Sequence, residues 1–177
     1  MTHSWPGKTR TVELRIFCII LFLLVIPLAA LVFSGMNPAL LGPVIGATLL
    51  LQAGAVGIVS ISGHPVVHYT GIVSVGFAFI LIEFEILDAL STESKRVAGW
   101  IARVDEKARK LTLIERYGVY TLVPLMWIPG IGLYGGVIIA WIFDWNRRQA
   151  IALLATGWLL ACSAVLLFVL GLLRYIF

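Results

Sequence analysis

The chain has 177 residues, of which 60% are hydrophobic and only 12% are charged, and its formal net charge is +4. About a quarter of the residues in a soluble domain are charged, so this composition excludes an ordinary soluble protein and indicates an integral membrane protein. The positive charge does not predict a nucleic-acid partner, because the few cations lie at the ends of apolar runs, where membrane proteins place them.

The first charge-free run, Ile16–Ile82, has room for about three membrane crossings of about 20 residues each. Its first part predicts a transmembrane helix over 16–34, after a cytoplasmic N-terminus over 1–15. Three cations before an apolar run are also typical of a signal peptide. This run is longer than the apolar part of a signal peptide, and further membrane segments follow it, so we expect it to remain as an anchor.

The remainder of this run predicts two more segments, 38–63 and 65–90. If both crossed the membrane, the central loop with its seven cations would lie opposite the cationic N-terminus, against the positive-inside rule. We therefore predict that the glycine-rich segment 38–63 is a re-entrant hairpin with both ends outside, and that 65–90 is a transmembrane helix. The loop over 91–116 has apolar residues at helical spacing, which predicts a cytoplasmic amphipathic helix on the membrane surface. A solvated linker helix fits that pattern nearly as well.

The second apolar run, Tyr117–Phe143, contains a Pro-Gly pair at its centre and precedes the cations Arg147 and Arg148. A single crossing would place these cations outside. As one helix the run would be about 40 Å long, against a hydrocarbon core of about 30 Å, although tilt can absorb the excess. The charges and the central helix breaker together predict a re-entrant hairpin over 117–143, followed by a transmembrane helix over 149–173.

These elements predict an all-α integral membrane protein with an extra N-terminal transmembrane helix. The remainder forms an inverted repeat, in which a re-entrant helical hairpin plus a transmembrane helix occurs twice in opposite orientation. Repeats built on interrupted helices are typical of transporters, whose substrate sites lie where the two interruptions meet near the middle of the bilayer. The sequence therefore predicts a substrate path between the two hairpins.

The segment "ERYGVYTLVPLMWIPGIGLYGG" and the residues after it resemble the C-terminal half of the small multidrug-export protein family, within the wider DedA/VTT-like membrane group. The matching residues are Tyr117-Gly118, Ile128-Pro129-Gly130, Gly135, the short cationic turn and Gly157. This resemblance implies transport, and the wider group implies lipid scrambling or polyprenyl-phosphate flipping. The upstream match is looser and leaves two choices for the first hairpin, 16–36 or 38–63. We prefer 38–63 because it directly precedes its partner helix.

Nine residues are predicted to line the substrate path, because they lie in or beside the two interruptions. They are Pro129, Gly130, Gly132, Gly135, Gly136, Gln52, Gly54, Trp127 and Tyr134. Glycines also allow close helix packing in membranes, which is the structural alternative for that group. Gln52 is a polar side chain deep in an apolar segment. It either lines the substrate path or makes a structural hydrogen bond between helices.

Glu83 and Glu85 are candidate proton carriers, because a carboxyl group at membrane depth can exchange a proton. The alternative, which the pattern favours, places them at the cytoplasmic interface in ion pairs with Lys or Arg. His64 and His68 have the spacing of helical metal ligands, but the sequence shows no third ligand nearby, so we expect no metal. The sequence has no catalytic motif and no cofactor motif, and we expect neither an enzyme nor a cofactor.

The sequence thus predicts a multi-pass transporter of the cell membrane with a cytoplasmic N-terminus. Its substrates would be small amphiphilic molecules that it exports, or lipids or polyprenyl phosphates that it translocates in the DedA-like manner. Its expected partners are the bilayer, that substrate and possible further copies in a homo-oligomer. The alternative is a non-transporting membrane scaffold or subunit that binds partner helices through its glycine-rich faces.

Overall fold

The computed structural model describes residues 8–60, 64–93, 117–128 and 132–176. These residues form helices joined by turns, and they contain no strand. In chain order the elements are α1 (Lys8–Ile20), the π-helix η1 (Leu21–Val25), α2 (Ile26–Phe33), the 3₁₀ helix η2 (Pro38–Leu40), α3 (Leu41–Leu51), α4 (Gly54–Ser60), α5 (Pro65–Glu93), the 3₁₀ helix η3 (Gly118–Thr121), α8 (Leu122–Leu125), α9 (Gly132–Ile142) and α10 (Arg147–Ile176). The predicted linker helix lies almost entirely outside these ranges.

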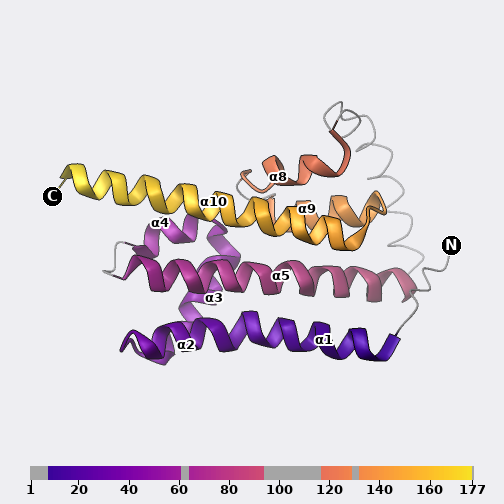
Figure 1. The fold of residues 1–177 in the computed structure, drawn as a ribbon, viewed down its shortest axis with the longest axis horizontal. Helices are drawn as coiled ribbons and strands as arrows, with labels where there is room; N and C mark the ends of the chain where they lie inside the picture. The colour runs from indigo at the N-terminus through magenta and orange to yellow at the C-terminus, as the bar shows by residue number, and fades with distance from the viewer. Residues whose placement is uncertain (1–7, 61–63, 94–116, 129–131, 177) are drawn as a thin grey trace.

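Three long rods run side by side through the molecule (Figure 1). They are the continuous α1–η1–α2 helix, α5 and α10. Each contains a stretch that is long and apolar enough to cross a membrane: Leu14–Phe33, Pro65–Ala89 and Arg147–Gly171. The prediction of an all-helical membrane protein is confirmed for the described residues. The first rod already begins at Lys8, inside the segment 1–15 that the sequence predicts to precede it.

The short helices lie against opposite ends of the rods (Figure 1). α3 and α4 lie near the end where α2 stops and α5 begins, and α4 packs on both α5 and α10. α9 lies near the other end, where α5 stops and α10 begins, and it also packs on α5 and α10. The long helix α5 also contacts α1, α2 and α3, so it packs on all the other longer helices that the structure describes.

A π-helical turn interrupts the first rod because of Pro27. The N–H of Ile26 bonds to the carbonyl of Leu21, five residues back, and proline has no N–H for the next bond. The carbonyl of Phe22 instead accepts a hydrogen bond of 2.6 Å from the Ser74 hydroxyl on α5. Since lipid provides no donor for a freed carbonyl, this bond both satisfies the turn and fastens the first rod to α5.

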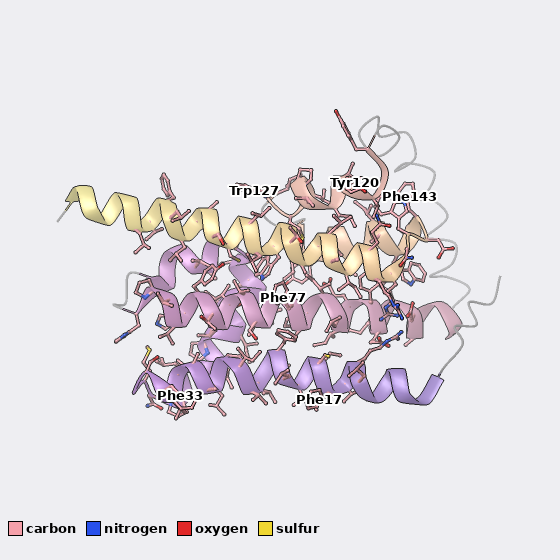
Figure 2. The ribbon with its side chains drawn as sticks, in the orientation of Figure 1. Phe17, Phe33, Phe77, Tyr120, Trp127 and Phe143 are labelled. Carbon is pink, nitrogen blue, oxygen red and sulfur yellow. The ribbon has the colours of Figure 1, made fainter. Side chains whose placement is uncertain are left out.

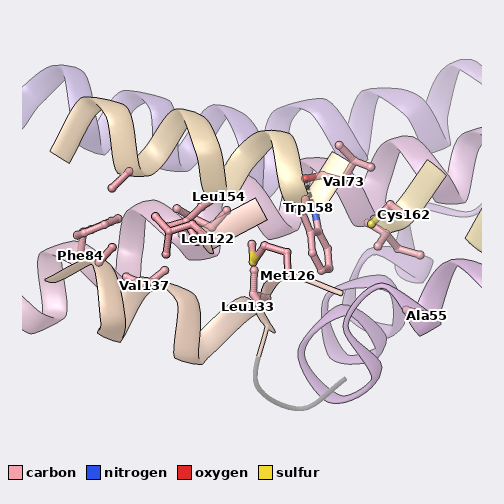
Figure 3. Packing of buried hydrophobic residues seen from close by; sticks show 14 of the residues in the cluster. Ala55, Val73, Phe84, Leu122, Met126, Leu133, Val137, Leu154, Trp158 and Cys162 are labelled. Atoms are coloured by element: carbon pink, nitrogen blue, oxygen red, sulfur yellow. Dashed lines mark hydrogen bonds between the residues drawn. The ribbon is translucent and has the colours of Figure 1, made fainter. Parts of the chain in front are cut away.

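The core between α5 and α10 is built around Trp158, which is 1% exposed (Figure 3). Its indole N–H donates to the Val73 carbonyl at 3.2 Å. The indole lies against Gly76, where an added Cβ would come within 2.2 Å of the ring. Large apolar side chains such as Phe17 and Phe33 point outward instead (Figure 2). Close packing against a glycine inside and large apolar side chains on the outer surface are typical of helices packed in lipid.

Candidate functional site

Ion pairs join three rods at one end of the molecule. Arg147, the first residue of α10, binds Glu85 and Asp88 of α5, each at 2.5 Å. Arg15 of α1 binds Glu85 at 3.0 Å, and the indole N–H of Trp141 on α9 donates to Asp88 at 2.9 Å. We refer to these five residues as the charged cluster. It places the N-terminal part of α1, the C-terminal part of α5 and the turn between α9 and α10 at the same end.

The second interruption lies between α8 and α9. The Gly132 N–H bonds to the Ile128 carbonyl at 2.8 Å, and a Cβ at Gly132 would lie 2.6 Å from the Met126 carbonyl oxygen. A Cβ at Gly136 would lie 2.7 Å from Leu154 of α10. Both glycines are buried, so the close packing that is their structural alternative is present here.

The other residues predicted at this interruption differ in exposure. Trp127 is 53% exposed and Gly135 is half-buried. Pro129 and Gly130 lie outside the described residues. The interruption therefore has a packed side, which faces α10, and an outer side that carries Trp127.

The first interruption lies between α3 and α4, at Gln52. Its backbone has φ +51° and ψ −134°, a conformation that residues other than glycine rarely adopt and that costs about 1–3 kcal/mol. Gln52 is only 5% exposed, and its carbonyl accepts the Ala55 N–H at 3.0 Å, which starts α4. Gly54 is exposed, and an added Cβ there would meet open space.

One hydrogen bond connects the two interruptions. The Tyr134 hydroxyl, in the first turn of α9, donates to the Leu49 carbonyl at 2.5 Å. Leu49 belongs to the last turn of α3, whose four final carbonyls have no partner within the helix. Because α3 is apolar apart from Thr48, that carbonyl would otherwise face hydrocarbon. Tyr134 thus satisfies it and brings α9 to a point three residues before Gln52 in the chain.

We expect Tyr134→Phe to lower the stability of the folded protein by about 1 kcal/mol, because it removes one hydrogen bond between helices. The measurement is the thermal unfolding midpoint of the detergent-solubilised protein. Tyr120→Phe is the matched control, because Tyr120 is 63% exposed. Equal midpoints for both variants would contradict the importance of this bond.

The two candidate proton carriers lie in different surroundings. Glu85 belongs to the charged cluster, where it binds Arg15 and Arg147. Glu83 has a buried carboxylate oxygen, Oε2, with no hydrogen-bond partner among the described residues.

His64 and His68 do not join a larger set of ligands. In the parts of the chain that the structure describes, no three His, Cys, Asp or Glu side chains group as a metal site would require. His68 is buried near the start of α5, and His64 is exposed just before it.

Two contacts of this region were not predicted from the sequence. The charge pattern predicts ion pairs for the acidic residues, but it does not identify Arg147 and Arg15 as the partners. The bond from Tyr134 to α3 depends on how α9 is rotated about its axis. The signal that could have suggested it is the position of a lone hydroxyl next to a helix breaker in an apolar run, since such a group needs an acceptor.

A family model described as "Putative small multi-drug export protein" matches residues 45–164. The matched region includes both interruptions, all of α5 and the larger part of α10. No curated protein and no solved structure matched the chain.

Proposed function

The chain belongs to the small multi-drug export protein family, and on that premise we propose that it is a membrane transporter whose substrate path runs between the two interruptions. The bond between Tyr134 and Leu49 is the observation that carries this proposal, because it joins the ends of two broken helices. Transporters commonly bind their substrates where such ends meet.

In the proposed membrane arrangement, α3–α4 and α8–α9 are two re-entrant hairpins that enter from opposite sides. α3 and α9 have 11 residues each, which is about 16 Å of helix and about half of the hydrocarbon core. The charged cluster supports a common side for the start of the first rod and for the turn before α10. By the positive-inside rule that side is the cytoplasm, and the N-terminus lies there.

The chemistry between the interruptions favours small amphiphilic cations as substrates. The last turn of α3 provides carbonyl dipoles that point their negative ends toward this region, and Tyr134 provides a hydroxyl oxygen. On α5, Glu83 adds a buried carboxylate oxygen that has no hydrogen-bond partner among the described residues. A phosphate group would instead need a cation, and Arg15 and Arg147 are already bound to carboxylates. This argues for export of cationic amphiphiles over flipping of polyprenyl phosphates.

The test is flux through purified protein in proteoliposomes, with a fluorescent amphiphilic cation in one set and a fluorescent lipid in another. We expect the cation to leave protein-containing vesicles faster than empty ones, and the lipid to redistribute equally in both. Gln52→Leu is expected to remove most of the cation flux. Leu50→Ala is its control, because Leu50 is in the same turn and 85% exposed. Lipid redistribution alone would favour the translocase instead, and no flux of either kind would contradict transport.

Cysteine labelling separates transport from the scaffold alternative. In a protein without Cys18 and Cys162, cysteines at positions 52 and 54 are expected to react with a water-soluble maleimide if a path reaches them. Position 54 is suitable because a side chain there meets open space, whereas position 132 would force a cysteine against the Met126 carbonyl. A scaffold predicts no reaction at either position, together with co-purification of a larger complex. A cysteine at Asn146 reports orientation and should react only from the cytoplasmic side.

A further inference from the structure

We propose that the charged cluster is the gate at the cytoplasmic end of the substrate path, and that this gate opens when Arg147 separates from α5. The inference rests on the proposed transport function and names the residues that close one end of its path. It is carried by a difference between two contacts that join α5 to α10. The contact at Arg147 is charged and partly exposed, whereas the contact at Trp158 is neutral and buried.

The neutral contact fixes α5 and α10 to each other. The Trp158 ring occupies the space beside Gly76, and its N–H donates to the Val73 carbonyl at 3.2 Å. Farther from the charged cluster, the hydroxyls of Tyr69 and Ser163 share a hydrogen bond of 2.7 Å. Neither contact carries a charge, and the indole is 1% exposed. Because interlocked side chains in a close-packed core resist separation, this part of the two helices is the fixed point of the movement.

The charged contact is easier to separate. Arg147 precedes Trp158 by 11 positions in α10, which is about 16 Å of helix. Its partners Glu85 and Asp88 have side chains that are 36% and 38% exposed, so water can solvate both carboxylates when the ion pairs break. The Trp141 indole, which bonds to Asp88 from α9, is released at the same time. The start of α10 can therefore swing away from α5 while the contact at Trp158 remains closed.

The ion pairs also indicate which helices move together. Glu85 binds Arg15 as well as Arg147, so α1 and α5 stay joined and Glu85 keeps a cation when Arg147 leaves. The helix α9 is connected to α10 by a short turn, and it packs so closely on α10 that a Cβ at Gly136 would lie 2.7 Å from Leu154. The moving unit is therefore α9 with the first part of α10, and the stationary unit is α1 with α5.

Opening would expose an apolar core that the charged cluster covers. The Arg147 guanidinium lies 5.2 Å from the centre of the Phe84 ring, which is 3% exposed. Ala140 of α9 and Ala150 of α10 belong to the same core and are 1% and 0% exposed. These two alanines lie on the moving unit, so a cysteine in place of either one reports whether water enters from this end.

The experiment measures the rate at which a water-soluble maleimide labels Ala150→Cys in the full-length protein in detergent, without substrate and without Cys18 and Cys162. We expect slow labelling when Arg147 is present, and a rate about fivefold higher or more when Arg147→Gln is added. Arg148→Gln is the matched control and should leave the rate unchanged, because Arg148 is exposed. Ala140→Cys is the second reporter and replaces the first if Ala150→Cys does not fold.

The native Cys162 distinguishes a gate from general loosening. It is 0% exposed and lies on α10 beyond Trp158, on the side away from Arg147. In a protein without Cys18, we expect Cys162 to stay unreactive in both wild type and Arg147→Gln, because the contact at Trp158 keeps that part closed. A general loss of packing would instead raise the labelling of Cys162 together with that of the reporter.

The outcomes separate this inference from transport itself. Equal reporter rates in wild type and Arg147→Gln, an equal rise in Arg148→Gln, or a parallel rise at Cys162 would overturn the gate. If the reporter behaves as expected but wild type shows no proteoliposome flux, the opening at Arg147 stands and transport fails. If wild type shows flux but the reporter rate does not change in Arg147→Gln, transport stands and the gate fails.

Discussion

Gly76→Ala is expected to destabilise the protein by about 2–3 kcal/mol, because the added methyl group would enter the space of the Trp158 indole. Three ring atoms would lie within 2.2 to 2.6 Å of the new Cβ. The ring cannot move aside easily, since it is 1% exposed and its N–H is bonded to the Val73 carbonyl. The measurements are the thermal unfolding midpoint and tryptophan fluorescence, which should report a more polar indole environment.

Gly57→Ala is the matched control. A Cβ at Gly57 would meet side chains of α10 at 3.5 and 3.6 Å, which is ordinary contact, so we expect a change within about 0.5 kcal/mol. A double variant, Gly76→Ala with Trp158→Leu, removes the ring. Its loss of stability should be smaller than the sum of the losses caused by the two single substitutions. Equal midpoints for Gly76→Ala and Gly57→Ala would show that the indole does not occupy this space.

Arg147→Gln is expected to lower stability by about 2 kcal/mol and to loosen α9 and α10 from α5. The substitution leaves Glu85 and Asp88 close together without their shared cation. Removing one partner of a buried pair costs about 3–5 kcal/mol, and solvent reduces this here because the two carboxylate side chains are 36% and 38% exposed. The thermal unfolding midpoint in low salt is the measurement, and high salt should reduce the difference from wild type.

Arg148→Gln tests whether the loss of stability comes from the position of Arg147 in the charged cluster or from the loss of any positive charge at this turn. Arg148 is the next residue and is exposed, so its loss should change the midpoint little. Adding Asp88→Asn to Arg147→Gln should restore part of the stability, because Glu85 still pairs with Arg15 and the carboxylate that lost its cation is then removed. If Arg148→Gln destabilises as much as Arg147→Gln, the charged cluster does not hold these helices together.

The sequence predicts the class of this fold well, because the constraint of the bilayer acts on composition and on the length of each apolar run. It also indicates both interruptions, since Gln52 and the Pro-Gly pair are conspicuous in apolar surroundings. What it does not predict is where each helix ends. The first interruption is a residue with positive φ at Gln52, and the neighbouring Gly54 is helical, although glycine would adopt that conformation more easily.

The contacts between rods were beyond prediction for a related reason. Trp158 and Gly76 are 82 positions apart, and their contact depends on the rotation and depth of two long helices whose middle parts are largely apolar. Periodicity decides which face of an amphipathic helix is buried, but it gives little guidance when every face is apolar. Ser74 and Phe22 are a similar case, although Pro27 signals that a carbonyl nearby must find a new donor.

The charged cluster also has a consequence for how the newly made chain acquires its orientation. In the finished protein Arg15 and Arg147 are balanced by Glu85 and Asp88, so neither arginine contributes a net charge to its surface. An arginine that guides topology must do so while it is still unpaired, as the nascent segment leaves the ribosome and enters the insertion machinery. For Arg147 this interval ends when its helix docks on α5, so pairing before that point would neutralise the charge before it could act as a topology signal.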